Sequence, residues 1–323
     1  MQGERIQLQD AGISRAPHTM SPDTPNQKLI ETLYVGAGQL SWGARLSPNR
    51  WQRLFTEDIA WLNQYRFVIY NLVFTQTKIR YHRSTLGVFW TLLNPLLLLG
   101  VQSLVFSQIL RLGYRDYALY LFSGLLPWQF FASALDGASR TLIANEGLIR
   151  KVAAPKIIFP LSDVLFAGVN LLLSFVALFL FFLLFRAPLH PQVILLIPGI
   201  ILLTGFIFGL SLIGMTLVTF FRDVGNIIGV GLSALYFISP VLYPPRMIRE
   251  HDHFLRFNPL SYYLDFFHCA LIEGRVLTDN AAMVGGIWPP LSTWIISTAF
   301  TLGTIMIGYI VYKSNEHEYI FRL

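Results

Sequence analysis

Six stretches of the chain are apolar over lengths that cross a lipid bilayer. A bilayer core is about 30 Å thick and is crossed by about 20 apolar helical residues. Charged side chains stand mainly between these stretches, and none occurs from His190 to Phe221 if histidine is counted as neutral. The stretches are 87–110, 117–135, 161–185, 193–221, 225–243 and 291–312. The pattern predicts an all-α integral membrane protein whose residues 87–323 form a domain of six transmembrane helices.

The residues before the first stretch have a different pattern. Residues 1–55 mix Gln, Asp, Pro, Ser and Gly without a sustained apolar run, which indicates a flexible cytosolic tail and no ordinary secretory signal peptide. From Thr56, acids follow a helix-capping residue and apolar positions recur at helical spacing. Residues 56–86 are therefore expected to form an amphipathic helix in the membrane interface that ends in a basic cluster. An amphipathic helix packed on another domain is the alternative.

Basic residues predict the orientation of the chain. Lys78, Arg80 and Arg83 stand directly before the first apolar stretch, and positive charge beside a first span holds that end in the cytosol. With this start, six spans leave 17 of the 24 basic residues inside, whereas the inverted topology would place those 17 outside. Both termini are thus expected in the cytosol, and the last external segment is 244–290.

That external segment contains a further helix signal. Asn258-Pro259 can begin a helix, and Tyr262, Tyr263 and Phe266 continue it. Such a short helix is expected to dip into the outer leaflet, and a surface helix with an apolar underside is the alternative. Glycines that permit close helix approach occur in the fourth apolar stretch, at Gly199, Gly205, Gly209 and Gly214.

Composition and motifs narrow the function. The 323 residues are 54% hydrophobic and 13% charged, against roughly 25% charge in soluble domains. The net charge of +6 fits a cytosolic lipid surface better than nucleic acid, which is not expected as a partner. The single Cys269 excludes a disulfide framework, and no pair of histidines at metal spacing or Gly-x-Ser-x-Gly elbow points to an enzyme.

Energy for transport must come from another polypeptide. A phosphate-binding loop ends in Gly-Lys-Ser or Gly-Lys-Thr, and none of the lysines here follows a glycine. We therefore expect this chain to bind no cofactor, with ATP and magnesium held by a partner subunit. Two cytosolic loops offer contacts for it: 140–160, and the turn that contains Arg222 and Asp223. Considered alone, each loop is better explained as a positive-inside anchor, the second with a local ion pair.

Five motifs occur in order along residues 56–323. They are Lys78-Ile79-Arg80-Tyr81-x-Arg83-Ser84-x-Leu86-Gly87-x-x-Trp90-x-x-Leu93-Asn94-Pro95, Gly147-Leu148-Ile149-Arg150-Lys151, Phe221-Arg222-Asp223-Val224, Ser239-Pro240-Val241-Leu242-Tyr243-Pro244 and Asn258-Pro259. In this register the chain resembles the transmembrane subunit of ABC type-2 exporters, specifically the polysaccharide and O-antigen export branch.

The resemblance implies a homodimer in the plasma (inner) membrane, joined to two copies of a separate ATPase. Together they would export a glycan carried on a polyprenyl-diphosphate lipid from the cytosol. It further implies roles for particular residues. ATPase coupling would fall to Leu148, Ile149, Arg150, Lys151, Arg222 and Asp223, and the external gate to Asn258, Tyr262, Tyr263 and Phe266.

A sugar chain is too polar for lipid but binds flat aromatic faces beside hydroxyl and amide groups. Candidate channel-lining residues are therefore Trp90, Asn94, Tyr120, Trp128, Gln129, Tyr236 and Tyr243, although each aromatic alone is better explained as a packing or lipid-facing residue. Lys78, Arg80 and Arg83 are candidates for binding the lipid diphosphate through charge-assisted hydrogen bonds.

Three other functions stay open at this point. The same architecture could export teichoic acid or a capsule polymer. A type-2 exporter of drugs or small lipids would have a narrower apolar cavity. A membrane-embedded glycosyl or acyl transferase belongs to a different class.

Overall fold

The computed structural model describes residues 64–81, 89–150, 154–184, 190–245, 257–272 and 287–323. These residues all belong to one compact unit, 61–323. The tail 1–55, the start of the amphipathic helix at Thr56 and the side chains of Arg83 and Lys151 lie outside the described residues, so those predictions stay predictions.

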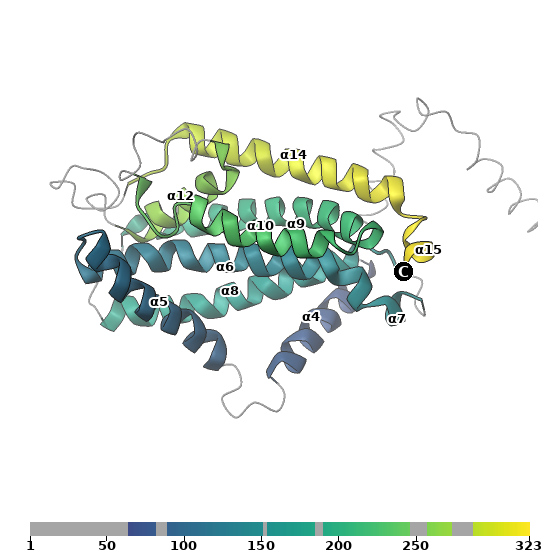
Figure 1. Ribbon diagram of the computed structural model, residues 1–323, viewed down its shortest axis with the longest axis horizontal. Coiled ribbons are helices and arrows are strands. Elements are labelled where there is room, and N and C mark those ends of the chain that lie inside the picture. The colour runs from purple at the N-terminus through teal and green to yellow at the C-terminus, as the bar shows by residue number, and fades with distance from the viewer. Residues whose placement is uncertain (1–63, 82–88, 151–153, 185–189, 246–256, 273–286) are drawn as a thin grey trace, which may run out of the picture. The chain divides into compact units, whose positions relative to one another are not determined.

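Every element in the described ranges is a helix (Figure 1). The elements are α4 (Arg66–Tyr81), α5 (Phe89–Ile109), α6 (Tyr114–Ala144), α7 (Glu146–Ile149), α8 (Ile158–Leu184), the 3-10 helix η1 (Pro191–Leu195), α9 (Leu196–Phe220), α10 (Val224–Ile238), α12 (Pro259–Leu271), α14 (Leu291–Asn315) and α15 (Tyr319–Arg322). The predicted all-α architecture is confirmed.

Four of these helices are long and apolar enough to cross a membrane: α6, α8, η1 with α9, and α14. The apolar part of α5, Leu96–Ile109, and the whole of α10 are shorter. Helix α10 ends at Ile238 because Ser239 precedes a proline and takes an extended backbone, with ψ at 149°. Its 15 residues span about 22 Å, less than a bilayer core. The six-span arrangement therefore stays a prediction.

Helix α6 is longer than its apolar stretch. The hydrophobic pattern predicts a helix over 117–135 and a loop from Arg140, but the helix continues to Ala144. The extension is amphipathic, so it does not appear as an apolar run. Ala138 and Leu142 are buried, while Asp136 and Arg140 are half-exposed. The first cytosolic loop is shorter than expected for this reason.

The two ends of the helix bundle carry different elements (Figure 1). Helices α7 and α15 lie at one end, and α12 lies toward the opposite end. Helix α12 contacts η1, α9, α14 and α6. The side chain of Asn258 accepts a hydrogen bond from the backbone N–H of Leu260 at 3.0 Å, which caps α12 as the sequence indicates. Most of its side chains are buried, so α12 is inserted among longer helices and is not a surface helix.

Helix α4 packs on α8 and keeps one side open. Phe67, Tyr70 and Phe74 on this helix are each more than half exposed. Exposed aromatic residues on an amphipathic helix fit the expected position in the membrane interface, which stays a prediction.

Helices α9 and α14 touch backbone to backbone. A Cβ at Gly209 would overlap the backbone of Thr304 and Ile305, and a Cβ at Gly308 would overlap the carbonyl of Gly209. The expectation that glycines of the fourth stretch permit close approach is confirmed here. Small residues let membrane helices gain van der Waals contact that lipid tails do not replace.

We expect Gly209→Ala and Gly308→Ala each to lower the free energy of unfolding by about 1–3 kcal/mol, because an added methyl must push the helices apart. Gly303→Ala on α14 is the matched control, since its Cβ meets nothing within 4 Å. Alanine there should be neutral or stabilising by up to about 1 kcal/mol. Thermal unfolding in one detergent measures all three, and equal losses for Gly209→Ala and Gly303→Ala would contradict the packing account.

Candidate functional site

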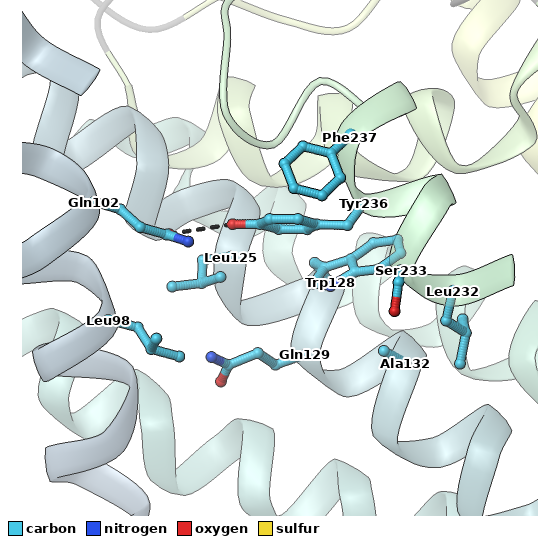
Figure 2. A pocket seen from close by; sticks show the side chains of 10 residues that line it. All are labelled: Leu98, Gln102, Leu125, Trp128, Gln129, Ala132, Leu232, Ser233, Tyr236 and Phe237. Carbon is cyan, nitrogen blue, oxygen red and sulfur yellow. Dashed lines mark hydrogen bonds between the residues drawn. The ribbon is translucent and has the colours of Figure 1, made fainter. Parts of the chain in front are cut away.

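A pocket of about 380 Å³ lies between α5, α6 and α10 and is open on one side. Its wall combines three aromatic side chains, two amides and two hydroxyls with aliphatic side chains (Figure 2). The lining residues are Leu98, Gln102, Leu125, Trp128, Gln129, Ala132, Leu232, Ser233, Tyr236 and Phe237. Three predicted channel residues, Trp128, Gln129 and Tyr236, are thus brought together from two helices.

Polar and aromatic groups are interleaved in this pocket. The Trp128 and Tyr236 rings are 5.3 Å apart at 47°. The Tyr236 hydroxyl donates to Gln102 Oε1 at 3.1 Å, across from α10 to α5 (Figure 2). Gln129 is half-buried, and its amide makes no hydrogen bond within the described residues. A pocket of this kind can bind a ligand with both flat apolar faces and hydroxyl groups.

Gln102 and Ser233 were not among the predicted lining residues. Both lie inside apolar stretches, where a polar side chain is costly unless it faces the interior or a cavity. A polar residue inside an apolar stretch could therefore have indicated a pocket, and Gln102 is the clearest example.

Two other predicted channel residues meet at the turn after α10: Tyr243 is part of it, and Tyr120 of α6 contacts it. Tyr120 is fully buried, and its hydroxyl donates to the carbonyl oxygens of Pro240 at 2.6 Å and Tyr243 at 2.7 Å. The Tyr243 hydroxyl donates to the carbonyl of Ile238 at 2.8 Å. Tyr120 therefore does not face the pocket, because its hydroxyl is needed by backbone groups that the end of α10 leaves free. The side chains of Trp90 and Asn94, in the first turns of α5, lie outside the described residues.

A buried histidine joins the same turn. His268 of α12 has Nε2 at 3.1 Å from the Pro240 carbonyl oxygen, to which it donates, and Nδ1 at 2.9 Å from Ser123 Oγ of α6. Its ring stacks on Tyr120, with centroids 4.5 Å apart. No sequence pattern indicates these contacts, since His268 and its partners lie on different elements.

The predicted gate residues are mostly buried. Asn258 donates to Ser239 Oγ at 2.8 Å, which ties the start of α12 to the turn after α10. Tyr263 donates to the Ser297 carbonyl at 2.9 Å and lies 2.8 Å from Thr301 Oγ1 of α14. The Phe266 ring meets that of Trp294 edge-on at 4.8 Å, and Tyr262 is half-buried.

The predicted coupling residues differ in exposure. In α7, Leu148 is 39% exposed, whereas Ile149 is buried. Arg150 pairs with Glu146 at 2.9 Å within the same short helix. Arg222 and Asp223 are exposed in the turn before α10, and the local ion pair between them does not form in the described structure. Within the part of this loop that the structure describes, Leu148 is the exposed large apolar side chain.

The predicted basic cluster is spread over different surroundings. Lys78 is exposed at the last turn of α4. The Arg80 guanidinium lies over the Phe166 ring of α8, 5.5 Å from its centroid. As for metals, no group of three His, Cys, Asp or Glu residues gathers within the described ranges.

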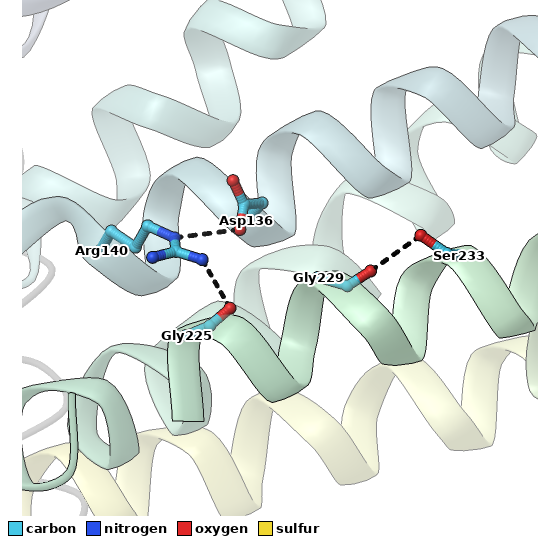
Figure 3. A network of polar contacts seen from close by, with 5 residues as sticks. All are labelled: Asp136, Arg140, Gly225, Gly229 and Ser233. Atoms are coloured by element: carbon cyan, nitrogen blue, oxygen red, sulfur yellow. Dashed lines mark hydrogen bonds and ion pairs between the residues drawn. The ribbon is translucent and has the colours of Figure 1, made fainter. Parts of the chain in front are cut away.

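Arg140 joins α6 to α10 (Figure 3). Its Nε pairs with Asp136 one turn earlier at 3.1 Å, and its terminal nitrogen donates to the Gly225 carbonyl of α10 at 2.5 Å. A Cβ at Gly225 would come within 2.9 Å of the guanidinium, so glycine makes room for it. The spacing of Asp136 and Arg140 predicts their ion pair. No sequence pattern predicts that Arg140 also donates to a backbone carbonyl of another helix.

Arg140→Gln should loosen the start of α10, because glutamine cannot hold the Asp136 carboxylate and the Gly225 carbonyl together. We expect faster amide hydrogen exchange over 226–231 with unchanged exchange in α14. Arg150→Gln is the matched control, since Arg150 has the same ion-pair spacing without a bond to a second helix. Unchanged exchange in Arg140→Gln would show that α10 is held by other contacts.

Comparison with known proteins agrees with this arrangement. Residues 68–271 match the family described as ABC-2 type transporter. The O-antigen export system permease protein RfbA of Klebsiella pneumoniae is 34% identical over 188 residues, which are 57% of this chain and 72% of that protein. The protein of the same name from Myxococcus xanthus is 27% identical over 242 residues, 74% of this chain and 93% of that protein. The polysialic acid transport protein KpsM of Escherichia coli is 25% identical over 260 residues, 76% and 92% of the two chains. With several helices able to cross a bilayer and a family match over more than half of its length, this chain is a multi-pass membrane protein and belongs to the ABC-2 type transporter family.

Proposed function

We propose that this chain is the transmembrane subunit of an ATP-driven exporter that moves a lipid-linked polysaccharide of the O-antigen type across the plasma (inner) membrane. The observation that carries the proposal is the pocket between α5, α6 and α10 in a chain 34% identical to an O-antigen export permease. The proposed role is transport, with ATP and magnesium on a separate ATPase subunit.

The chemistry of the pocket supports a sugar polymer over a small apolar drug. The rings of Trp128 and Tyr236 offer apolar faces to a pyranose ring, and the free amide of Gln129 offers hydrogen bonds to its hydroxyls. Neighbouring Ser233 adds a hydroxyl that bonds only its own helix at the Gly229 carbonyl, 3.0 Å away (Figure 3). An O-antigen chain is favoured because the O-antigen export permease RfbA is 34% identical, whereas the polysialic acid transport protein KpsM is 25% identical. A teichoic acid would use the same groups.

We further propose that a second copy of the chain completes the channel. The pocket is open on one side, and apolar side chains on α5 and α10 are exposed beside it, among them Val101, Leu104, Val230 and Phe237. In this homodimer the two open pockets face a shared path, which would be wider than either alone. Asn258, Tyr262, Tyr263 and Phe266 of α12 lie toward the end of that path opposite to α7, which supports an external gate.

Two copies of the ATPase would dock at the end that carries α7. Leu148 is exposed there, with Arg150 and Lys151 next to it in the sequence, and the exposed turn of Arg222 and Asp223 leads directly into α10. Both termini are proposed to lie on this cytosolic side. Lys78 and Arg83 remain candidates for attracting the lipid diphosphate, whereas the Arg80 guanidinium lies over the Phe166 ring of α8.

The pocket is tested by Gln129→Leu, which removes an amide without breaking a hydrogen bond of the described structure. A neutral hydrogen bond contributes about 0.5–1.5 kcal/mol, so export should fall roughly two- to tenfold. Gln108→Leu is the control, because Gln108 is exposed on α5 and does not line the pocket. The measurement is export of a lipid-linked O-antigen glycan by vesicles that contain this chain and its ATPase. Equal export by both variants would remove the pocket from the path.

The coupling site is tested at Leu148. Leu148→Asp places a charge at the proposed apolar contact, so it should abolish glycan-stimulated ATP hydrolysis and export while the protein still reaches the membrane. Leu148→Met keeps the apolar contact and should retain both activities. Normal stimulated hydrolysis in Leu148→Asp would show that α7 is not part of the ATPase interface.

A further inference from the structure

A second pocket lies where α4 packs against α6 and α8, separate from the one between α5, α6 and α10. Its volume is about 430 Å³, within the roughly 300–1,000 Å³ of small-molecule sites. The wall is mainly apolar and carries polar groups from all three helices. The lining residues are Gln76, Ile79, Arg80, Ser133, Gly137, Asp163, Phe166, Ala167 and Asn170.

One cation of this pocket lacks an anionic partner. The Arg80 guanidinium rests on the Phe166 ring, and no carboxylate in the described structure pairs with it. Arg80 is otherwise exposed, so its N–H groups stay available to a ligand in the pocket. A guanidinium presented in this way is suited to two parallel hydrogen bonds with a phosphate group.

One anion of this pocket lacks a cationic partner. Asp163 accepts a hydrogen bond from Gln76 Nε2 at 2.5 Å, and no cation in the described structure lies within ion-pair distance. It stands six residues into α8, a helix able to cross the membrane. A carboxylate at such a position is costly, and its neutral partners, the Thr141 hydroxyl and the Gln76 amide, offset only part of that cost. A positively charged group entering the pocket would supply the missing partner.

The pocket lies near one end of the helices that build it. It is formed by the last turns of α4, the second half of α6 and the first half of α8, close to where α6 ends and α8 begins. Phospholipid headgroups lie at the ends of membrane helices. We propose that this pocket binds the headgroup of a phospholipid with a primary amine, with Arg80 at its phosphate and Asp163 at its ammonium group.

A lipid diphosphate is less suited to the same pocket. It carries more than one negative charge and no cation, so Asp163 would repel it while Arg80 attracted it. An aminoethyl phosphate headgroup is neutral overall and matches one cation and one anion in a single cavity. The lipid site is therefore independent of the polysaccharide path and of its proposed substrate.

Native mass spectrometry of the full-length chain in detergent tests the site. The probes are phosphatidylethanolamine and phosphatidylcholine with the same acyl chains, because the quaternary ammonium of the second has no N–H donor. We expect phosphatidylethanolamine to bind about tenfold or more tightly, as for the loss of a charge-assisted hydrogen bond. Equal affinity for the two lipids would overturn the proposal.

Substitutions inside and outside the pocket test which residues cause the preference for phosphatidylethanolamine. In Asp163→Asn the tenfold ratio should fall to about one, and in Arg80→Gln both lipids should bind more weakly. Arg66→Gln, on the same helix but exposed outside the pocket, is the matched control and should keep the ratio. A ratio that persists in Asp163→Asn would place the lipid elsewhere.

Gly137→Leu keeps the test decisive if Asp163→Asn does not fold. A Cβ at Gly137 meets nothing within 4 Å, so the side chain can enter the pocket while the polar groups stay intact. This variant should lose the preference for phosphatidylethanolamine. A polyprenyl diphosphate that binds the wild-type chain more tightly than phosphatidylethanolamine, and is lost in Gly137→Leu, would assign the pocket to the transported lipid and overturn the proposal.

Discussion

The turn after α10 depends on hydrogen bonds from buried side chains. A buried turn at a proline leaves backbone carbonyls without helical partners, and each buried polar group without a partner costs about 1–3 kcal/mol. Here Tyr117 donates to the Leu242 carbonyl at 2.8 Å, while Tyr120 and His268 both donate to the Pro240 carbonyl. These three side chains hold the turn against α6 and α12. The positions of α10, of α12 and of the pocket follow from that attachment.

Helix α10 is fastened to α6 at both ends. Tyr120 near the start of α6 holds the turn after α10, and Arg140 near the end of α6 holds Gly225 in the first turn of α10. The pocket residues Trp128 and Tyr236 lie between these two attachments. Because α7 directly follows α6, a displacement of α7 reaches both ends of α10 through one continuous helix. The proposed mechanism uses this path to link an ATPase at α7 with the pocket that would contact the glycan.

The sequence predicts what a single helix determines and misses what depends on neighbours. Apolar runs locate the long helices, and Gly209 marks a close helix contact correctly, because both signals are local. Tyr120 was predicted to line a channel. Its hydrogen bonds in the structure are made to the turn after α10, and no local pattern in α6 indicates where that turn lies. The Arg140 contact was missed because its acceptor is a backbone carbonyl. The sequence indicates no role for Asp163, since its pocket is completed by α4, which is distant in the sequence.

The central claim is that the pocket between α5, α6 and α10 lies on the path of the exported glycan. Site-specific photo-crosslinking during export tests it most directly. A photoreactive amino acid at the exposed pocket residue Ser233 is compared with one at Ile201, which is 65% exposed on α9 and away from the pocket. The account predicts crosslinks from position 233, and not 201, to the lipid-linked glycan, formed only when the ATPase and ATP are present. Crosslinks to phospholipid alone at position 233, or export by this chain without an ATPase, would contradict it.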